Sequence, residues 1–193
     1  KHTVHVGNSI VVQSYVQRHF HRVEVWFLYA GRLSAVKNVG PMIEAVKSYD
    51  RTCSFTILGD GEERGKMEKL ADGDKRIRFI GAVKPDEVQK AMKEADVLIM
   101  NSTFEGIPMT ILEAISQGLP VITTDVGGIK EVLTYGKDSE VTDGSVERIH
   151  TAMDKILLDY EAYAKAAYDK SLQFDYRKVN RKVFDVLNES LHW

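Results

Sequence analysis

Two glutamates, Glu105 and Glu113, stand on either side of an expected helix start, and their spacing could serve a single ligand. The loop 101–108 (NSTFEGIP) follows an apolar run and leads into an apolar helical pattern. A helix N-terminus offers free N–H groups and the positive end of a dipole, which suit a phosphate, and Gly106 would let a ligand approach the backbone closely. Pro108 and Glu113 lie about 7.5 Å apart along a helix, so the two carboxylates could contact different parts of one molecule. The alternatives are that Glu105 caps the helix and that Glu113 is a surface charge.

Two cations, Arg32 and Lys37, occupy a glycine-led loop, 31–37 (GRLSAVK), at the end of an earlier apolar run. An arginine can grip a phosphate through two N–H groups, and a lysine supplies a point charge. If this loop faced the helix start near Glu105, the two groups could neutralise a diphosphate without a metal ion. Fixed positive charge of that kind stabilises a leaving group as its bond breaks. The alternative is a pair of solvated loop cations.

Both loops can meet only if the fold brings several strand ends together. The chain alternates short β-rich runs with helical patterns, which predicts parallel strands joined by right-handed crossover helices. We therefore predict an α/β fold with a doubly wound parallel sheet, Rossmann-like in type, followed by C-terminal helices. The expected strands are 23–30, 52–58, 77–81, 96–100 and 119–124, and the expected helices are 41–49, 62–71, 85–95, 108–117, 128–133, 146–160, 161–172 and 176–191.

Ligands bind doubly wound sheets at the carboxyl ends of the strands. This rule selects four loops, which are 31–40, 59–61, 81–84 and 101–108. We divide the chain into three parts: a junction to another domain over 1–22, a Rossmann-like binding domain over 23–145, and helices over 146–193 that pack on the same domain.

Four sequence elements of this chain occur in the same order in one enzyme family. They are Gly31-Arg32-Leu33 with Lys37, then 105–113 (EGIPMTILE), 118–121 (GLPV) and 127–132 (GGIKEV). In combination they resemble the donor-binding, C-terminal domain of retaining glycosyltransferases of family 4 (glycosyl transferases group 1). These enzymes have two facing Rossmann-like domains, the GT-B fold. The resemblance covers about residues 8–185, and any one element alone would be weak.

The resemblance implies a metal-independent transferase whose donor is a nucleoside-diphosphate sugar, such as a UDP-sugar, with no separate cofactor. Arg32 and Lys37 would bind the diphosphate, and Glu105 would position and stabilise the transferred sugar. The other implied contacts are the backbone of Gly106, Ile107, Pro108 and Met109 for the sugar hydroxyls, Thr110 near the phosphates, Glu113 for the ribose hydroxyls, and Gly81, Ala82 and Val83 for the nucleobase. Retention would follow from front-face attack assisted by the leaving phosphate.

The sequence departs from the family pattern in two places. Relatives follow the GGxxEV element with a turn and an apolar strand, whereas 135–145 (YGKDSEVTDGS) is short and polar, with Val141 as its single candidate core residue. The sequence leaves open whether the last strand is missing, rebuilt or simply absent from this chain. The acceptor-binding domain is also outside this chain, and 8–10 (NSI) resembles the junction that leads to it.

By resemblance, the missing N-terminal domain is a partner, and the reaction is hexosyl transfer to a glycan or a lipid-linked acceptor. The setting so implied is polysaccharide biosynthesis in the cytoplasm, with peripheral association at the inner face of the membrane. Two other functions stay open. One is a catalytically silent module that binds a nucleotide sugar, and the other is a sugar-nucleotide epimerase or phosphorylase of the same fold.

Composition limits the other classes. The formal net charge is −2, with 26 basic and 28 acidic residues, and a nucleic-acid surface would bring a basic excess, so we expect no nucleic-acid partner. No apolar run approaches the roughly 18–20 residues of a membrane span. The single Cys53 predicts a buried core thiol. We interpret 72–74 (DGD) as a solvated turn and His19 and His21 as surface residues rather than metal ligands.

Overall fold

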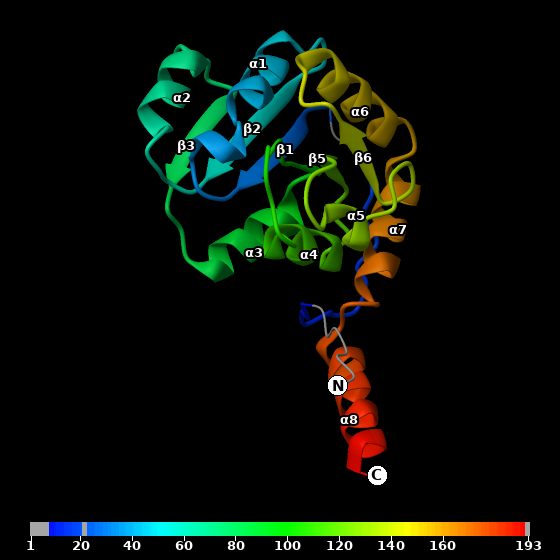
Figure 1. The fold of residues 1–193 in the computed structure, drawn as a ribbon. Coiled ribbons are helices and arrows are strands. Elements are labelled where there is room, and N and C mark those ends of the chain that lie inside the picture. The colour runs from blue at the N-terminus through cyan, green and yellow to red at the C-terminus, as the bar shows by residue number, and fades with distance from the viewer. Residues whose placement is uncertain (1–7, 21–22, 192–193) are drawn as a thin grey trace.

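A computed structural model describes residues 8–20 and 23–191, and its centre is one six-stranded sheet in which every pairing is parallel. The strand order is β3-β2-β1-β4-β5-β6, so the direction of winding reverses between β1 and β4, as in doubly wound sheets. The predicted fold class is therefore confirmed (Figure 1). The strands are β1 (Val25–Ala30), β2 (Cys53–Leu58), β3 (Ile77–Gly81), β4 (Val97–Ile99), β5 (Val121–Thr124) and β6 (Ser139–Thr142).

Helices cover both faces of the sheet (Figure 1). One hydrophobic cluster joins α1, α2 and α6 to one face, a second joins α3, α4 and α5 to the other, and α7 contributes to both. The helices are η1 (Ala35–Lys37), α1 (Gly40–Ser48), α2 (Arg64–Ala71), α3 (Pro85–Glu94), α4 (Met109–Ser116), α5 (Ile129–Val132), α6 (Val146–Leu158), α7 (Tyr160–Ser171) and α8 (Tyr176–Leu191).

Burial on both faces explains the composition of the central strands. In β1, Phe27 and Tyr29 belong to one cluster, while Leu28 and Ala30 belong to the other. A parallel strand between two helix layers has no solvent side, so a continuous apolar run is its expected pattern.

Of the alternatives left open for the last strand, the structure shows a rebuilt strand and not a missing one. β6 is present and pairs with β5 over four residues, from Ser139 to Thr142. Its inward-facing Glu140 is buried, and its carboxylate accepts hydrogen bonds from the Tyr163 hydroxyl (2.5 Å) and the Lys155 ammonium (3.1 Å). A buried carboxylate is tolerated when it is paired and hydrogen-bonded. The buried face of the strand thus consists of satisfied polar groups and not of apolar side chains, which is why hydrophobic pattern alone did not find it.

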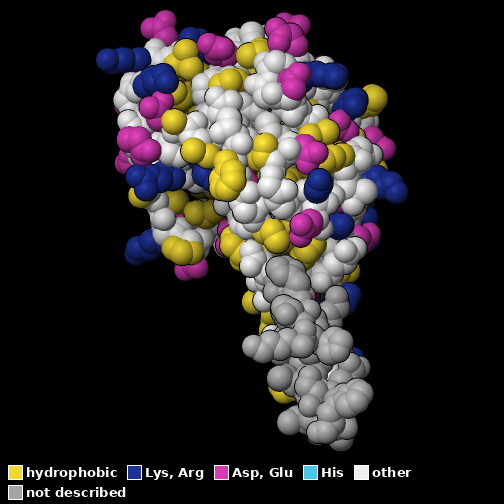
Figure 2. Space-filling view, viewed as in Figure 1, with side chains coloured by type: hydrophobic (Ala, Val, Ile, Leu, Met, Phe, Trp, Pro, Cys, Tyr) yellow, Lys and Arg dark blue, Asp and Glu magenta, His cyan; other side chains and the backbone are white. Residues whose placement is uncertain are grey.

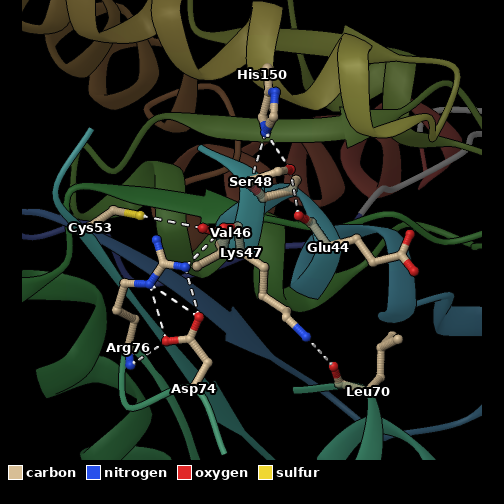
Figure 3. A network of polar contacts seen from close by, with 10 residues as sticks. Glu44, Val46, Lys47, Ser48, Cys53, Leu70, Asp74, Arg76 and His150 are labelled. Atoms are coloured by element: carbon tan, nitrogen blue, oxygen red, sulfur yellow. Dashed lines mark hydrogen bonds and ion pairs between the residues drawn. The ribbon is translucent and has the colours of Figure 1, made fainter. Parts of the chain in front are cut away.

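A polar network lies at the amino edge of the sheet, opposite the strand ends that lead into the four selected loops (Figure 3). Arg76 is paired with Asp74 and donates to the carbonyl of Lys47, while the Lys47 ammonium donates to the carbonyl of Leu70. Cations suit these positions because the carboxyl end of a helix carries negative partial charge. Cys53 lies beside this network as a free, buried thiol, as predicted, and burial raises its pKa.

A third cation of this kind, Arg18, holds the segment before β1 against the domain. The Arg18 guanidinium donates to the carbonyls of Met92, Ala95 and Gln117, at the ends of α3 and α4. A cavity of about 320 Å³ lies beside it, at the edge of the sheet away from the four selected loops. The expected junction 1–22 is described only in part, since residues 1–7 and 21–22, including His21, lie outside the described residues.

The last helix differs from the two before it. Whereas α6 and α7 pack on the body of the domain, α8 projects away from it (Figure 1). Its first turn is held by the Tyr176 amide, which donates to the Ile10 carbonyl, and by the ion pair of Arg177 with Asp175. That ion pair and its hydrogen bonds hold the pKa of Asp175 well below its usual range.

We predict that Tyr163→Phe destabilises the fold through β6. The substitution removes one hydrogen bond from the buried Glu140 carboxylate, and a hydrogen bond to a charged group contributes about 1.5–3 kcal/mol. Chemical denaturation should show a loss of that size. In the matched control Tyr135→Phe, the lost hydroxyl bonds the exposed Asp125, so the change should stay within about 0.5 kcal/mol. Equal losses in the two variants would contradict the assigned role of Glu140.

Candidate active site

The predicted site begins where β4 ends and α4 starts. Pro108 precedes the helix, and the first hydrogen bonds within it are donated by Ile111 and Leu112 to the Pro108 carbonyl. The amides of Met109 and Thr110 come before those bonds, so they belong to the unsatisfied first turn of the helix. Gly106 and Met109 are exposed. This helix start therefore has the open geometry that the sequence predicts for an anion.

An ion pair joins this loop to the loop after β1. The Lys37 ammonium lies 2.5 Å from Glu105 Oε1, and the Ser102 hydroxyl donates to the same oxygen at 2.6 Å. The Glu105 side chain is only 9% exposed and that of Lys37 23%, so the pair is largely shielded from water and its attraction is stronger than that of a surface pair. Glu105 does not cap α4, because in the part of the chain that the structure describes no side-chain hydrogen bond caps that helix.

Backbone contacts fix the two loops against each other. The Thr103 amide donates to the Val36 carbonyl at 2.8 Å, and Asn101 Nδ2 donates to the Asn38 carbonyl at 3.3 Å. Asn38 has a left-handed backbone conformation (φ 46°) that an asparagine tolerates better than most residues. Lys37 is thus presented to Glu105 by a rigid turn.

A glycine pair after β5 forms the back wall of the Glu105 loop. A Cβ atom at Gly127 would lie 1.7 Å from the Glu105 carbonyl oxygen, and the Gly128 amide donates to the Gly106 carbonyl at 3.1 Å. Gly127 also has φ +58°. Sterics therefore explain why glycines occupy the first two positions of the GGxxEV element. Side chains at Gly127 and Gly128 would push the loop that carries Glu105 out of position.

Glu113 lines a separate hollow at the same edge of the sheet. The hollow has a volume of about 340 Å³, and its lining residues are Ala30, Gly31, Leu58, Gly59, Ala82, Val83, Pro85, Val88, Thr110 and Glu113. Burial raises the pKa of Glu113, and its carboxylate has no hydrogen-bond partner among the described residues. Thr110 and Glu113 are thus the polar groups of a mostly apolar slot.

The structure brings some of the predicted residues together and not others. Lys37 and Glu105 meet, and Thr110 and Glu113 share the slot with Ala82 and Val83. Arg32 stands apart: its side chain is 72% exposed and pairs with Glu62 at 3.1 Å. Sequence reasoning missed Ser102, whose type alone carries no signal because serine is common in loops.

On the face drawn in Figure 2, lysine and arginine side chains are interspersed with aspartate and glutamate. Within residues 8–20 and 23–191, no three His, Cys, Asp or Glu side chains gather as a metal site would require. Among the helices of the same residues, none is long and apolar enough to cross a membrane. The expected turn 72–74 is confirmed, with Asp72 left-handed at the end of α2.

This fold defines a Rossmann-like α/β domain of the GT-B type, and comparison with known proteins agrees. The chain belongs to the glycosyl transferases group 1 family, whose model matches residues 17–171. It is 28% identical over 163 residues to the sulfoquinovosyl transferase SQD2 of Arabidopsis thaliana, covering 81% of this chain and 32% of that protein. It is 32% identical over 133 residues to the lipopolysaccharide core biosynthesis glycosyltransferase LpsE of Rhizobium meliloti, covering 67% of this chain and 38% of that protein.

Solved structures show the same fold. The apo galactosyltransferase WaaB, of the lipopolysaccharide outer core, matches with a TM-score of 0.82 at 21% identity, over 97% of this chain and 56% of that one. Anabaena HepE, in complex with UDP-glucose, matches with a TM-score of 0.75 at 21% identity, over 86% of this chain and 49% of that one. The chain therefore spans about a third of the length of these curated relatives and about half of these solved chains.

We predict that Gly127→Ala destabilises the protein more than Gly136→Ala does. Both glycines have positive φ, +58° and +77°, so both substitutions carry about 1–2 kcal/mol of left-handed strain. A Cβ at Gly136 meets nothing within 4 Å, whereas at Gly127 it collides with the Glu105 carbonyl. Thermal unfolding should show a loss at Gly127 that exceeds the control by about 1–3 kcal/mol, the scale of an overpacked site. Equal losses would mean that the glycine pair does not support the Glu105 loop.

Proposed function

We propose that this chain is the donor-binding part of a retaining glycosyltransferase of family 4 and that it binds a nucleoside-diphosphate sugar for hexosyl transfer to a glycan or lipid-linked acceptor. The observation that carries the proposal is the meeting of three features at one sheet edge: the Lys37–Glu105 pair, the open start of α4, and the slot that holds Glu113. Membership of the glycosyl transferases group 1 family supports it.

The diphosphate would lie between Lys37 and the first turn of α4. An ammonium group and free helix amides both favour negative charge, and charge grows on the diphosphate as the glycosidic bond breaks. Groups that are already fixed at that position stabilise the transition state without reorganisation. Arg32 would join them only after leaving Glu62, and an exposed ion pair of this kind holds a side chain weakly.

Glu105 and the loop that follows it would hold the transferred sugar. The Glu105 carboxylate lies at the base of the site, and the exposed backbone at Gly106 and Met109, with Ile107 and Pro108 between them, offers polar groups to sugar hydroxyls. In this proposal Glu105 positions and stabilises the sugar, and retention comes from attack on the face from which the diphosphate leaves.

The nucleoside would occupy the slot beside α4. Its walls at Ala82 and Val83, which directly follow Gly81 at the end of β3, suit the flat face of a base. Glu113 would accept hydrogen bonds from the two ribose hydroxyls, and Thr110 would reach the phosphates. The structural relatives HepE and GtfA are complexes with UDP, so we propose a UDP-sugar as the donor.

The acceptor would be held by a part of the enzyme that this chain does not contain. We propose an N-terminal domain as the partner, because the chain covers only about a third of the length of its curated relatives. Several of those relatives make lipopolysaccharide or a glycolipid, so we propose that the whole enzyme works in the cytoplasm at the inner face of a membrane, associated peripherally.

The first test is calorimetric titration of the chain with UDP, GDP and ADP. We expect UDP to bind, and we expect Lys37→Ala to weaken it roughly 10- to 100-fold, because a hydrogen bond to a charged group contributes about 1.5–3 kcal/mol. The control Lys66→Ala removes an exposed lysine that pairs with Glu63 and should leave the affinity unchanged. If the folded chain bound none of the three nucleotides at millimolar concentration, the proposal would be abandoned.

The second test uses the cost of the unpartnered Glu113 carboxylate. Since burial raises its pKa in the folded chain, the ionised group destabilises the fold above that pKa, and the cost disappears below the unfolded-state value of about 4.3. Glu113→Gln should therefore raise the melting temperature at pH 7, by no more than about 1 kcal/mol in stability, and give no gain at pH 4. The same variant should bind UDP more weakly. A variant that gained stability without losing affinity would exclude Glu113 from the nucleotide site.

A further inference from the structure

We propose that Ser102 is a positioning residue that holds Glu105 in place when the donor diphosphate takes Lys37 away from it. The inference rests on the proposed function, since it assumes that Lys37 is the diphosphate ligand. It assigns a role to a side chain that lies outside the four sequence elements named above.

The two oxygens of the Glu105 carboxylate have different surroundings. Lys37 and Ser102 both donate to Oε1, at 2.5 and 2.6 Å. Oε2 accepts no hydrogen bond from any described residue, and it is not one of the fully buried side-chain atoms that lack a partner, so it reaches the surface. One oxygen is therefore held by the protein, and the other is presented to a ligand.

Ser102 is itself held firmly. It is 1% exposed, so water does not compete for its hydroxyl, and its carbonyl accepts a hydrogen bond from the Thr124 hydroxyl at 2.6 Å. Thr124 ends β5, the strand next to β4. The backbone of Ser102 is thus anchored to the sheet, and this fixes the position from which its hydroxyl donates to Glu105.

Donor binding changes the balance at Oε1. The ammonium of Lys37 must turn from a carboxylate toward a diphosphate, and Glu105 then loses its counter-ion while negative charge arrives beside it. A buried charge that loses a partner is costly unless another hydrogen bond remains. Ser102 supplies that bond to Oε1. The Glu105 carboxylate therefore stays in place and keeps Oε2 directed at the bound molecule.

The test is UDP affinity in a double-mutant cycle of Ser102→Ala and Glu105→Ala. In the otherwise natural chain, Ser102→Ala should weaken UDP binding about tenfold, which corresponds to about 1.4 kcal/mol. In the Glu105→Ala background no carboxylate remains to be held, so the same change should alter the affinity less than twofold. An equal loss in both backgrounds would overturn the proposal, because Ser102 would then act on the loop in general.

Ser139→Ala is the matched control. Ser139 is also buried, and its hydroxyl also donates to a carboxylate, that of Asp138 at 2.8 Å, but it starts β6 at the amino edge of the sheet. We expect both serine variants to lower the melting temperature by roughly 2–4 °C, while only Ser102→Ala weakens UDP binding. A tenfold loss of affinity in Ser139→Ala would attribute the effect to general destabilisation and overturn the role of Ser102.

A melting-temperature cycle on the same variants, without ligand, separates this inference from the proposed function. If the natural chain bound none of UDP, GDP and ADP, the proposed function would fail, yet a loss from Ser102→Ala that vanishes in the Glu105→Ala background would still show that Ser102 holds Glu105. Additive losses in that cycle would overturn the holding contact whatever the nucleotide result.

Discussion

The ion pair of Lys37 with Glu105 is the interaction on which the arrangement of the site depends. The two residues come from loops that are 68 positions apart in sequence, and they meet because β1 and β4 are neighbours at the centre of the sheet. Little water reaches the pair, so a misplaced partner would leave a poorly solvated charge, which is costly. The backbone contacts between the two loops avoid this cost, because they hold Lys37 against Glu105.

The rest of the fold keeps those loops in place from outside. Glycines after β5 allow that loop to lie directly against Glu105, while cations at the amino edge satisfy the carbonyl ends of α1, α2, α3 and α4. At the amino edge the described helix ends are therefore satisfied by hydrogen bonds within the protein. At the carboxyl edge, Glu113 has no hydrogen-bond partner among the described residues and the first turn of α4 is open, and polar groups left unsatisfied in this way are available to a ligand.

Leaving the Glu113 carboxylate without a hydrogen bond lowers the stability of the fold. The nucleotide binding that we propose would explain why this cost is tolerated. Burial raises the pKa of Glu113 because nothing in the described chain compensates its charge. By contrast, Glu140 in β6 is more deeply buried but is fully engaged by Tyr163 and Lys155. One carboxylate stabilises structure, and the other is the group that we propose accepts hydrogen bonds from a bound nucleoside. Sites of function are where such local violations of the folding rules are expected.

The sequence by itself determined the alternation of strands and helices, the parallel sheet, the buried Cys53 and the loops at its carboxyl edge, because hydrophobic period and glycine or proline punctuation are local properties. It did not find β6, whose buried face is polar and is satisfied by distant side chains. Only the tertiary structure decided that Lys37 and Ser102 share one oxygen of Glu105 while Arg32 turns to Glu62. Such contacts depend on strand order and on side-chain direction in three dimensions, and neither is encoded in the spacing of residues along the chain.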